Sequence, residues 1–250
     1  MSNTPGSPDD AEASPQVIGR SDPVFDPAYS EQRVAYGGRG LDEHALAPTP
    51  LAQFRAWYAD ATAAGVPEPN AMTLATVDPA GAPSARIVLL KQADGRGFTF
   101  FTNHSSRKGT ELAGNPAAAL VFGWVPLHRQ VAVRGRAERV PRAETAAYFA
   151  SRPWESRIGA WASHQSAPTS REALDARFTE LAARWPDRGR PDDVPVPEHW
   201  GGYVVRPVEV EFWQGRPSRL HDRLVYVPKE PGTTPPLDDP AGWTIERRSP

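Results

Sequence analysis

The sequence contains no cysteine, and that absence removes several kinds of chemistry at once. Without thiols there is no disulfide bond, no thiolate nucleophile, no iron–sulfur cluster and no cysteine-ligated zinc site. Lysine is also scarce, because Lys91, Lys108 and Lys229 are the three in the chain and the other basic residues are arginines. A chain free of cysteine fits a cytoplasmic location, which we expect here.

Long apolar runs and a strong charge excess are missing as well. No stretch approaches the roughly 20 apolar residues that span a bilayer, and polar, acidic sequence follows Met1, so we expect neither a membrane partner nor a secretion signal. The net charge of −2 does not favour nucleic acid as a partner. With 39% hydrophobic and 23% charged residues, the 250-residue chain has the composition of a soluble globular protein.

Familiar catalytic motifs are absent too. The six histidines show no spacing typical of metal ligands, and we expect no metal site. There is no GxGxxG, Walker or GxSxG motif, and strands do not alternate with helices as a dinucleotide-binding fold requires.

Composition divides the chain into a leader and one domain. Residues 1–28 are rich in Pro, Ser, Gly, Asp and Ala without a periodic apolar pattern, which predicts a disordered leader. We expect residues 29–250 to form a single domain, beginning with a helix that Thr49 caps and Gly65 ends. The Pro-rich stretch 228–241 is expected to be a mobile surface insertion.

From residue 71 the apolar pattern becomes strand-like. Turn sequences separate the expected strands, which are 71–77, 84–91, 97–102, 117–124, 129–139, 202–213, 219–227 and 243–248. Further helices are expected at 106–113, at 142–151 and from Thr169, where Thr169 and Glu172 form a capping box, to Pro186. This order predicts a mainly β (α+β) fold in which an antiparallel sheet closes into a barrel with flanking helices.

The run from Arg86 to Lys91 places two cations at the ends of an apolar stretch. They are an odd number of residues apart, so an ideal strand directs them to opposite faces. One interpretation is that both are strand-end charges reaching solvent. The other is that each meets a different phosphate group, and this segment alone does not decide between them.

Two other segments also suggest anion sites. Between Phe101 and Lys108, hydroxyls, free backbone N–H groups at a helix start and adjacent cations would suit a phosphate, although a plain capped helix explains them too. Tyr148, Arg152 and Ser156 lie four residues apart, which on a helix and its continuation gives either one anion-binding face or an ordinary surface helix.

The sequence near the C-terminus gives the strongest local signal. Arg219, His221 and Arg223 alternate, so all three would face one side of a strand while Asp222 points the other way. Three cationic or ionisable groups without an acid on that face are electrostatically costly unless an anion is bound there. We therefore favour a functional interpretation for this strand.

Taken together, these segments resemble the pyridoxine/pyridoxamine 5′-phosphate oxidase family, from about Arg33 to the C-terminus and outside 228–241. The resemblance is carried, in order, by RIVLLK at 86–91, TNHSSRK at 102–108, RQV at 129–131, YFASRP at 148–153, IGAWASHQS at 158–166, WGG at 200–202 and EFWQG…RLHDR at 211–223. It implies an FMN-binding split barrel that forms a homodimer, with FMN in clefts at the subunit interface.

The resemblance also implies roles for individual residues. Arg86 and Lys108 would hold the FMN phosphate with Ser106 and Arg107. The rest of the FMN site would be lined by Ile87, Val88, Leu89, Lys91, Phe101, Thr102, Gln130, Gln165, Ser166, Trp213 and Arg223. The substrate phosphate would contact Lys91, Tyr148, Arg152 and Ser156. Arg219, Leu220 and His221 would lie over the pyridine ring, with Arg219 and His221 catalytic, and Arg33 and Tyr36 would form a lid.

The implied activity is FMN-dependent oxidation of pyridoxamine or pyridoxine 5′-phosphate to pyridoxal 5′-phosphate by O2, releasing H2O2 and, from the amine, ammonia. One alternative is a split-barrel relative with another substrate, such as a phenazine-pathway oxidase or a deazaflavin-dependent reductase. The intact set of substrate-phosphate residues argues against the deazaflavin enzyme. Another alternative is a protein that carries FMN or pyridoxal phosphate without turnover.

Overall fold

The computed structural model describes Met1, Tyr29, Tyr36 and residues 40–250. The expected leader, apart from Met1, and the candidate lid residue Arg33 lie outside the described residues. Residues from Tyr36 onward belong to one unit, which holds every element discussed below. Within the described part of the chain, no helix combines the length and apolar character that crossing a membrane requires. The cytoplasmic location stays a prediction.

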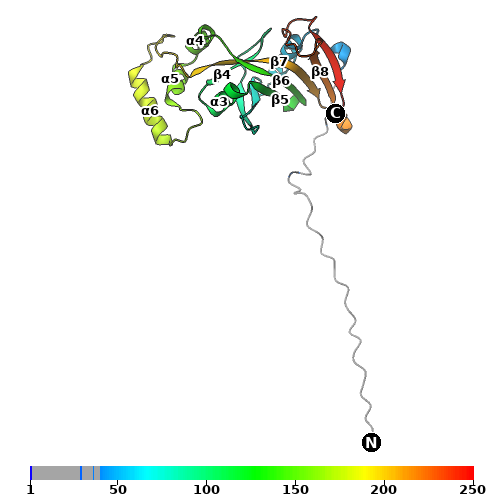
Figure 1. Cartoon of the computed structure of the whole chain (residues 1–250), viewed down its shortest axis with the longest axis horizontal. Helices are drawn as coiled ribbons and strands as arrows, with labels where there is room; N and C mark the ends of the chain where they lie inside the picture. The colour runs from blue at the N-terminus through cyan, green and yellow to red at the C-terminus, as the bar shows by residue number, and fades with distance from the viewer. Residues whose placement is uncertain (2–28, 30–35, 37–39) are drawn as a thin grey trace. The chain divides into compact units, whose positions relative to one another are not determined.

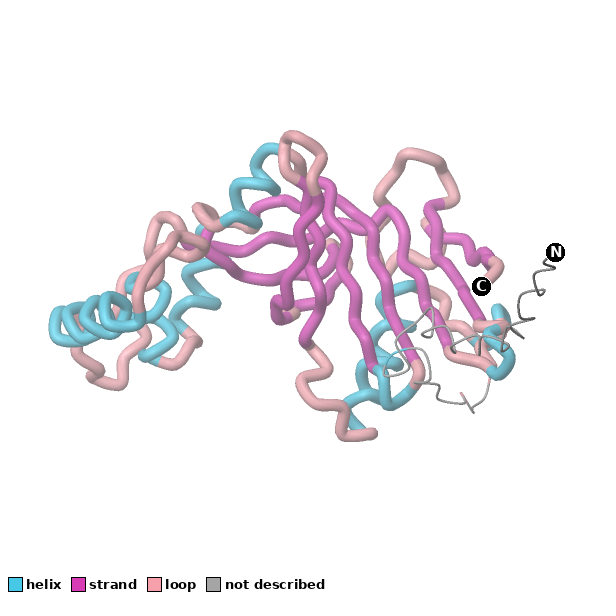
Figure 2. Tube along the Cα trace, turned by 90° about the horizontal axis from the view of Figure 1, so that it is seen from below, coloured by secondary structure: helices cyan, strands magenta, loops and turns pink. Residues whose placement is uncertain are grey.

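Strands dominate the fold, and each pairing between them is antiparallel. The strands of the described residues are β1 (Ala71–Val77), β2 (Pro83–Leu89), β3 (Gln92–Asp94), β4 (Gly97–Asn103), β5 (Ala117–Trp124), β6 (Arg129–Arg139), β7 (Trp200–Gln214), β8 (Asp222–Pro228) and β9 (Trp243–Arg248). They form one sheet in the order β2-β1-β5-β6-β7-β4-β3, with β8 added to β7 and β9 to β8. Figure 2 shows this sheet strongly curled, as the predicted barrel requires.

The helices and short 3-10 turns connect and cover these strands. They are η1 (Glu43–Ala45), α2 (Pro50–Ala63), α3 (Arg107–Gly114), η2 (Val125–Leu127), α4 (Arg142–Ala150), α5 (Trp154–Ala162), α6 (Arg171–Arg184) and η3 (Pro217–Arg219). Thr49 caps α2 as predicted, since its hydroxyl accepts a hydrogen bond from the N–H of Ala52. Gly65 follows the helix at φ 68°, where glycine is favoured.

The long strand β7 pairs with β4 over its first half and with β8 over its second half. The pairing with β4 runs from Asn103↔Trp200 to Phe98↔Val205. Strand β6 runs beside it throughout, with a β-bulge between Arg134 and Gly135 that bends the pair. Figure 1 shows α5 and α6 near the start of β7 and β8 near its end.

Two hydrophobic clusters hold this arrangement. In the main cluster the buried face of α2, including Phe54 and Trp57, packs on barrel residues such as Phe98 and Phe122. Phe54 lies 4.9 Å from Phe98 and 5.0 Å from Phe122 between ring centroids. A second cluster joins α4, α5 and α6 to the start of β7 through buried apolar side chains, namely Phe149, Ile158, Ala162, Leu181, Val194 and Trp200.

Several expected boundaries were wrong, each for a local reason. The helix expected at roughly 142–151 is present as α4, but sequence patterns missed the separate helix α5, for which Pro153 is the N-cap. Ser170, not Thr169, caps α6, because its hydroxyl accepts from the N–H of Ala173. The strand expected at 84–91 ends at Leu89, and the short strand β3 follows it.

The Pro-rich segment 228–241 contains a buried anchor. Leu237 is fully buried in the main cluster, its N–H donates to the carbonyl of Gly95, and its own carbonyl accepts from the N–H of Leu51. The indole N–H of Trp243 donates to Pro236. The segment is therefore held at its centre, while the mobility expected for the rest of it stays a prediction.

Candidate active site

A cavity of about 450 Å³ lies where β2, β4, α3 and α5 meet. Its lining brings together many residues that the sequence predicted for a site, namely Ile87, Val88, Leu89, Lys91, Phe101, Thr102, Lys108, Arg152, Ser156 and Gln165. Asn103, Ser163 and Trp200 also line it. Three of the lining side chains are cationic and none is acidic, so the cavity suits an anion.

One cationic end of the cavity is built on α3. Ser106 caps this helix with its hydroxyl, which leaves Lys108 in the first turn with its side chain buried. The Lys108 ammonium donates to Thr102 Oγ1 at 3.2 Å and to Gln165 Oε1 at 3.1 Å, both neutral acceptors. Burial, and then the nearby charge of Arg86, lower the pKa of Lys108. An anion bound here would compensate this buried charge.

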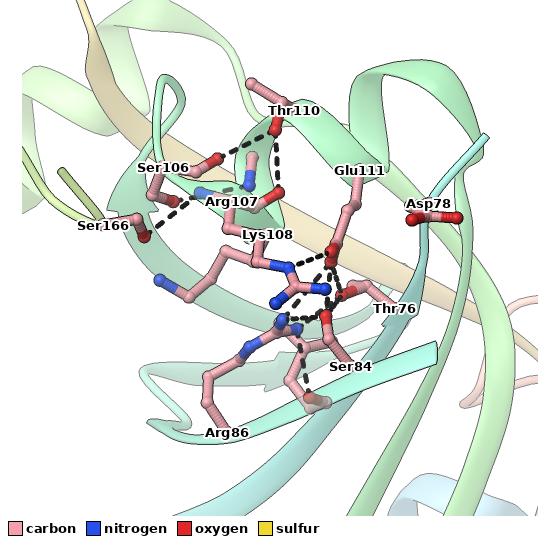
Figure 3. A network of polar contacts seen from close by, with 12 residues as sticks. Thr76, Asp78, Ser84, Arg86, Ser106, Arg107, Lys108, Thr110, Glu111 and Ser166 are labelled. Atoms are coloured by element: carbon pink, nitrogen blue, oxygen red, sulfur yellow. Dashed lines mark hydrogen bonds and ion pairs between the residues drawn. The ribbon is translucent and has the colours of Figure 1, made fainter. Parts of the chain in front are cut away.

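Beside this end, Arg86 and Arg107 both contact the carboxylate of Glu111 (Figure 3). The Arg86 guanidinium reaches Glu111 Oε2 at 3.3 Å, and Arg107 Nε donates to Oε1 at 2.9 Å. The backbone N–H of Arg107 donates to the hydroxyl of Ser166 at 3.2 Å. The helix start and its cations therefore meet β2 and the loop that carries Ser166, whereas their role at a phosphate stays a prediction.

The other cationic end lies near the start of β7. The Arg152 guanidinium lies over the Trp200 ring, and its Nη1 is buried without a hydrogen-bond partner in the described part of the chain. Burial lowers the pKa of Arg152. Tyr148 stacks on Phe101 with 4.1 Å between ring centroids. An unpaired buried donor of this kind fits a ligand that brings an acceptor.

The spacing of Tyr148, Arg152 and Ser156 suggested one face of a helix and its continuation. The three residues do not share one continuous helix. Tyr148 lies on α4, Arg152 lies in the turn after it, and Ser156 lies on α5. The turn at Pro153 brings Arg152 and Ser156 to the same cavity, but the periodicity of a single helix does not place them there.

Arg86 and Lys91 have different surroundings, as predicted, but strand alternation is not the reason. Lys91 lies beyond the end of β2, with its N–H donating to the carbonyl of Thr99, so strand alternation does not fix its direction. Arg86 turns toward α3, whereas Lys91 lines the cavity. That each cation meets a different phosphate stays a prediction.

The remaining candidates gather at the far end of β7. Gln130 pairs with Trp213 across β6 and β7, and the Trp213 ring lies 4.6 Å from that of His221. Tyr36 packs on the same group, with its ring 5.7 Å from His221 and 6.1 Å from Trp213. This second set, which also holds Arg219, Leu220 and Arg223, does not line the cavity.

The predicted strand 219–227 was wrong in its first part. Pro217 starts the 3-10 turn η3, and β8 begins only at Asp222, so Arg219 and His221 do not alternate with Arg223 on one strand. Arg219 and Ser218 have φ values of 62° and 58°. Two successive non-glycine residues in the left-handed region indicate strain, which is common at functional sites.

The expectation that no acid faces these cations was also wrong for Arg223. Its guanidinium donates to Glu211 Oε2 at 2.6 Å. Glu211 lies one strand away on β7, and this pairing is visible only once β7 and β8 are in register. Arg223 is therefore neutralised without a bound anion.

The two sets lie far apart along β7. Phe101 of the first set pairs with Gly202 on β7, and Trp213 of the second set lies eleven residues further along the same strand. At a rise of about 3.3 Å per residue this is roughly 36 Å along the strand. The two sets are therefore separate groups within one chain.

Comparison with known proteins gives this division a context. Residues 58–185 match the family model described as pyridoxamine 5′-phosphate oxidase. The chain is 64% identical over 220 residues to the pyridoxine/pyridoxamine 5′-phosphate oxidase of Kineococcus radiotolerans, covering 88% of this chain and 97% of that one. The chain belongs to the pyridoxamine 5′-phosphate oxidase family. It is accordingly an oxidoreductase of this family, which confirms the resemblance seen in the sequence.

Other members of the family give the same result. The corresponding oxidase of Bordetella avium is 55% identical over 221 residues, covering 88% of this chain and 99% of that one. Residues 200–250 match the model described as the pyridoxine 5′-phosphate oxidase C-terminal dimerisation region. That region includes β7, β8 and β9, and therefore most of the second set of site residues.

Solved structures confirm the predicted split barrel. PhzG from Burkholderia lata, solved with tetrahydrophenazine-1-carboxylic acid, has a TM-score of 0.75 at 29% identity and covers 87% of this chain and 100% of its own. A pyridoxamine 5′-phosphate oxidase-related, FMN binding protein from Nostoc punctiforme has a TM-score of 0.62 at 18% identity, covering 82% of this chain and 100% of its own. The second likeness shows the fold alone.

Among the residues that the sequence did not predict for the site, two contact the predicted arginines. Glu111 contacts Arg86 and Arg107, and only its position four residues after Arg107 gave a signal. Trp200 lies under the Arg152 guanidinium, and no local pattern indicated that contact although its WGG segment matched the family.

Proposed function

We propose that this chain oxidises pyridoxamine 5′-phosphate and pyridoxine 5′-phosphate to pyridoxal 5′-phosphate, with FMN as cofactor and O2 as acceptor. One observation carries the proposal: a single cavity is lined by three cationic side chains from different elements, Lys91, Lys108 and Arg152, and by no acidic one. Two phosphate esters, one of the cofactor and one of the substrate, would match these cations. The names of relatives up to 64% identical support the same activity.

The residues around α3 fit the phosphate of FMN. Lys108 supplies a buried ammonium, Arg86 and Arg107 supply guanidinium groups, and Ser106 and Ser166 supply hydroxyls at the start of the helix. Thr102, Gln165 and Phe101 would contact the remainder of the cofactor from β4 and the neighbouring loop. When bound, FMN takes two electrons from the substrate and O2 removes them as H2O2.

The surroundings of Arg152 fit the substrate phosphate. The Arg152 guanidinium lies over Trp200, its Nη1 is buried without a partner among the described residues, and Lys91 and Ser156 line the same cavity. Anchoring there would place the C4′ carbon of the substrate against the cofactor. For the amine, the balanced reaction converts CH2–NH2, O2 and H2O to CHO, NH3 and H2O2.

The second set would come from another copy of the chain. The dimerisation-region match covers most of it, and the two sets lie far apart along β7. Ile87 and Leu220, one in each set, are 72% and 71% exposed. Exposed apolar side chains of this kind are expected where a second subunit packs. In such a homodimer Arg219 and His221 would lie over the pyridine ring and hold it, and Tyr36, with Arg33, would close the pocket.

The visible spectrum of the purified protein tests the proposal. We expect flavin bands that bleach when pyridoxamine 5′-phosphate is added without oxygen, and H2O2 when air is admitted. Flavin bands that stay unchanged with both phosphorylated vitamers would exclude the activity and leave a carrier protein. A protein that binds no flavin would exclude the proposal altogether.

A phenazine-type substrate is the second candidate, because the structure of PhzG is similar and was solved with a carboxylic acid. A carboxylate can pair with Arg152 as a phosphate can, so this residue does not separate the two substrates. The names of relatives up to 64% identical favour the phosphorylated vitamers. Turnover of a tetrahydrophenazine carboxylic acid at a higher kcat/KM than pyridoxamine 5′-phosphate would reverse this preference.

A further inference from the structure

Glu111 lies at the centre of a polar network that joins three elements around the candidate cofactor-phosphate site (Figure 3). Its carboxylate is buried on α3, where it accepts from Thr76 Oγ1 of β1 at 2.5 Å and from Ser84 Oγ of β2 at 2.7 Å. It also accepts from Arg86 through Oε2 and from Arg107 through Oε1. The two arginines are therefore held by opposite oxygens of one carboxylate.

The hydroxyls in this network connect Arg86 to Glu111 a second time. Arg86 Nη1 donates to Thr76 Oγ1 at 2.5 Å, and its Nη2 donates to Ser84 Oγ. Each hydroxyl then donates onward to Glu111. Both terminal nitrogens of the guanidinium are thus fixed by bonded partners that converge on one acid, which restricts the rotation of a long side chain.

The carboxylate also sets the charge of the site. Arg86, Arg107 and Lys108 carry three positive charges, and Glu111 reduces the net charge to +2. Burial acts to raise the pKa of Glu111, but hydrogen bonds from two hydroxyls and two guanidinium groups outweigh it and lower the pKa to about 2. The acid is therefore ionised at neutral pH, and a net charge of +2 matches a phosphate monoester, which carries about −2 there.

We propose that Glu111 is a positioning residue for the phosphate of the cofactor, because it holds the guanidinium groups of Arg86 and Arg107 in place beside Lys108. This inference rests on the proposed FMN site and adds a residue to it. Glu111 acts through the two arginines and does not itself bind the phosphate, since a carboxylate and a phosphate repel each other.

The proposed role of Glu111 predicts in which direction FMN affinity changes when this residue is replaced. If Glu111 acted on the phosphate only through its charge, removing that charge would tighten FMN binding. If it positions the arginines, its removal weakens FMN binding although the site becomes more positive. Riboflavin, which lacks the phosphate, should bind equally well in both cases.

The experiment measures the dissociation constants of FMN and riboflavin by quenching of flavin fluorescence in the apoprotein. The variants are E111Q, which keeps an acceptor oxygen, E111D, which keeps the charge, and E111A, which removes both. E144Q is the matched control, because Glu144 also accepts two hydrogen bonds from one arginine, but that arginine, Arg96, is not among the candidate phosphate residues.

We expect E111A to weaken FMN binding about tenfold to a hundredfold, as the loss of charge-assisted hydrogen bonds predicts, and E111Q to weaken it less. Riboflavin binding should change less than twofold in the variants that fold, and E144Q should bind both flavins as the wild type does. If E111A does not fold, the dissociation constants of FMN in E111Q and E111D test the inference instead.

Unchanged or tighter FMN binding in E111Q and E111D would overturn the inference and leave the proposed function intact. Equal loss of FMN and riboflavin binding would overturn it too, since the residue would then support only the fold. A wild-type protein that binds neither flavin would remove the proposed function itself, and this inference with it.

Discussion

The guanidinium carbon of Arg152 lies 4.7 Å from the centre of the Trp200 ring. This contact joins the turn between α4 and α5 to the first residue of β7, and it leaves Nη1 buried without a hydrogen-bond partner among the described residues. A cation held by an aromatic face and desolvated on one side is prepared to bind an anion, because its position is fixed and its donor is free.

Replacing Arg152 should therefore affect phosphorylated substrates selectively. We expect R152Q to lower kcat/KM for pyridoxamine 5′-phosphate about a hundredfold, since roughly two charge-assisted hydrogen bonds to the phosphate are lost. Pyridoxamine, which lacks the phosphate, serves as the control substrate and should react equally with both enzymes. An equal fall with the two substrates would contradict the role given to Arg152.

The proposed division of the site between two copies predicts that inactive variants rescue each other. R152Q impairs the first set, and R219A, which should reduce turnover by orders of magnitude with FMN still bound, impairs the second. In a symmetric dimer, each heterodimer has one site with both changes and one with neither. Unfolding and refolding an equal mixture should restore about a quarter of wild-type activity.

The control for this mixture is each variant unfolded and refolded alone, which should stay inactive. If both sets served a site within one chain, no combination of the two variants would contain an intact site. Activity of the mixture no higher than that of the separate variants would then argue against a shared site.

His104 should make stability depend on pH. Burial, and then the charges of Arg139 and Arg142, lower the pKa of His104 to about 4 from an ordinary value of 6.5. Between these values the unfolded chain binds more protons than the folded one, so this contribution is fully present above pH 6.5 and is lost as the pH falls toward 4. Urea unfolding at pH 7.5 and 5 measures it.

The variant H104Q is the comparison for this prediction. It has no imidazole to protonate, so its free energy of unfolding should fall less between pH 7.5 and 5 than that of the wild type. Identical pH dependence in the two proteins would show that His104 is not the residue responsible.

Leu237 should contribute to stability despite its place in a Pro-rich segment. Its side chain is fully buried among core residues, so L237A should lower the free energy of unfolding by about 2–4 kcal/mol through the cavity that it creates. The exposed Thr233 of the same segment gives the control variant T233A, which should change stability by less than about 0.5 kcal/mol. Equal, small effects of the two changes would mean that the whole segment is mobile, as its composition predicted.

Local patterns predicted the elements that local forces build. The cap at Thr49 and the strand at 71–77 were found within a residue, because side-chain capping and alternating burial depend on neighbours in the chain. The first residues of β8 were placed wrongly, because alternation continues through Arg219 and His221 although Pro217 starts a turn. Such patterns do not show at which residue a strand begins to pair with its neighbour.

The sequence by itself determined the family, the order of the strands and the residue types that can bind two phosphates, since these follow from composition, periodicity and motif. Only the tertiary structure decided which charges meet. Glu111 joins Arg86, and Glu211 joins Arg223, through contacts between elements that lie apart in sequence. The length of β7 likewise separates the two sets of candidate residues, because distance along a strand keeps Trp213 from Phe101 however well both match their motifs.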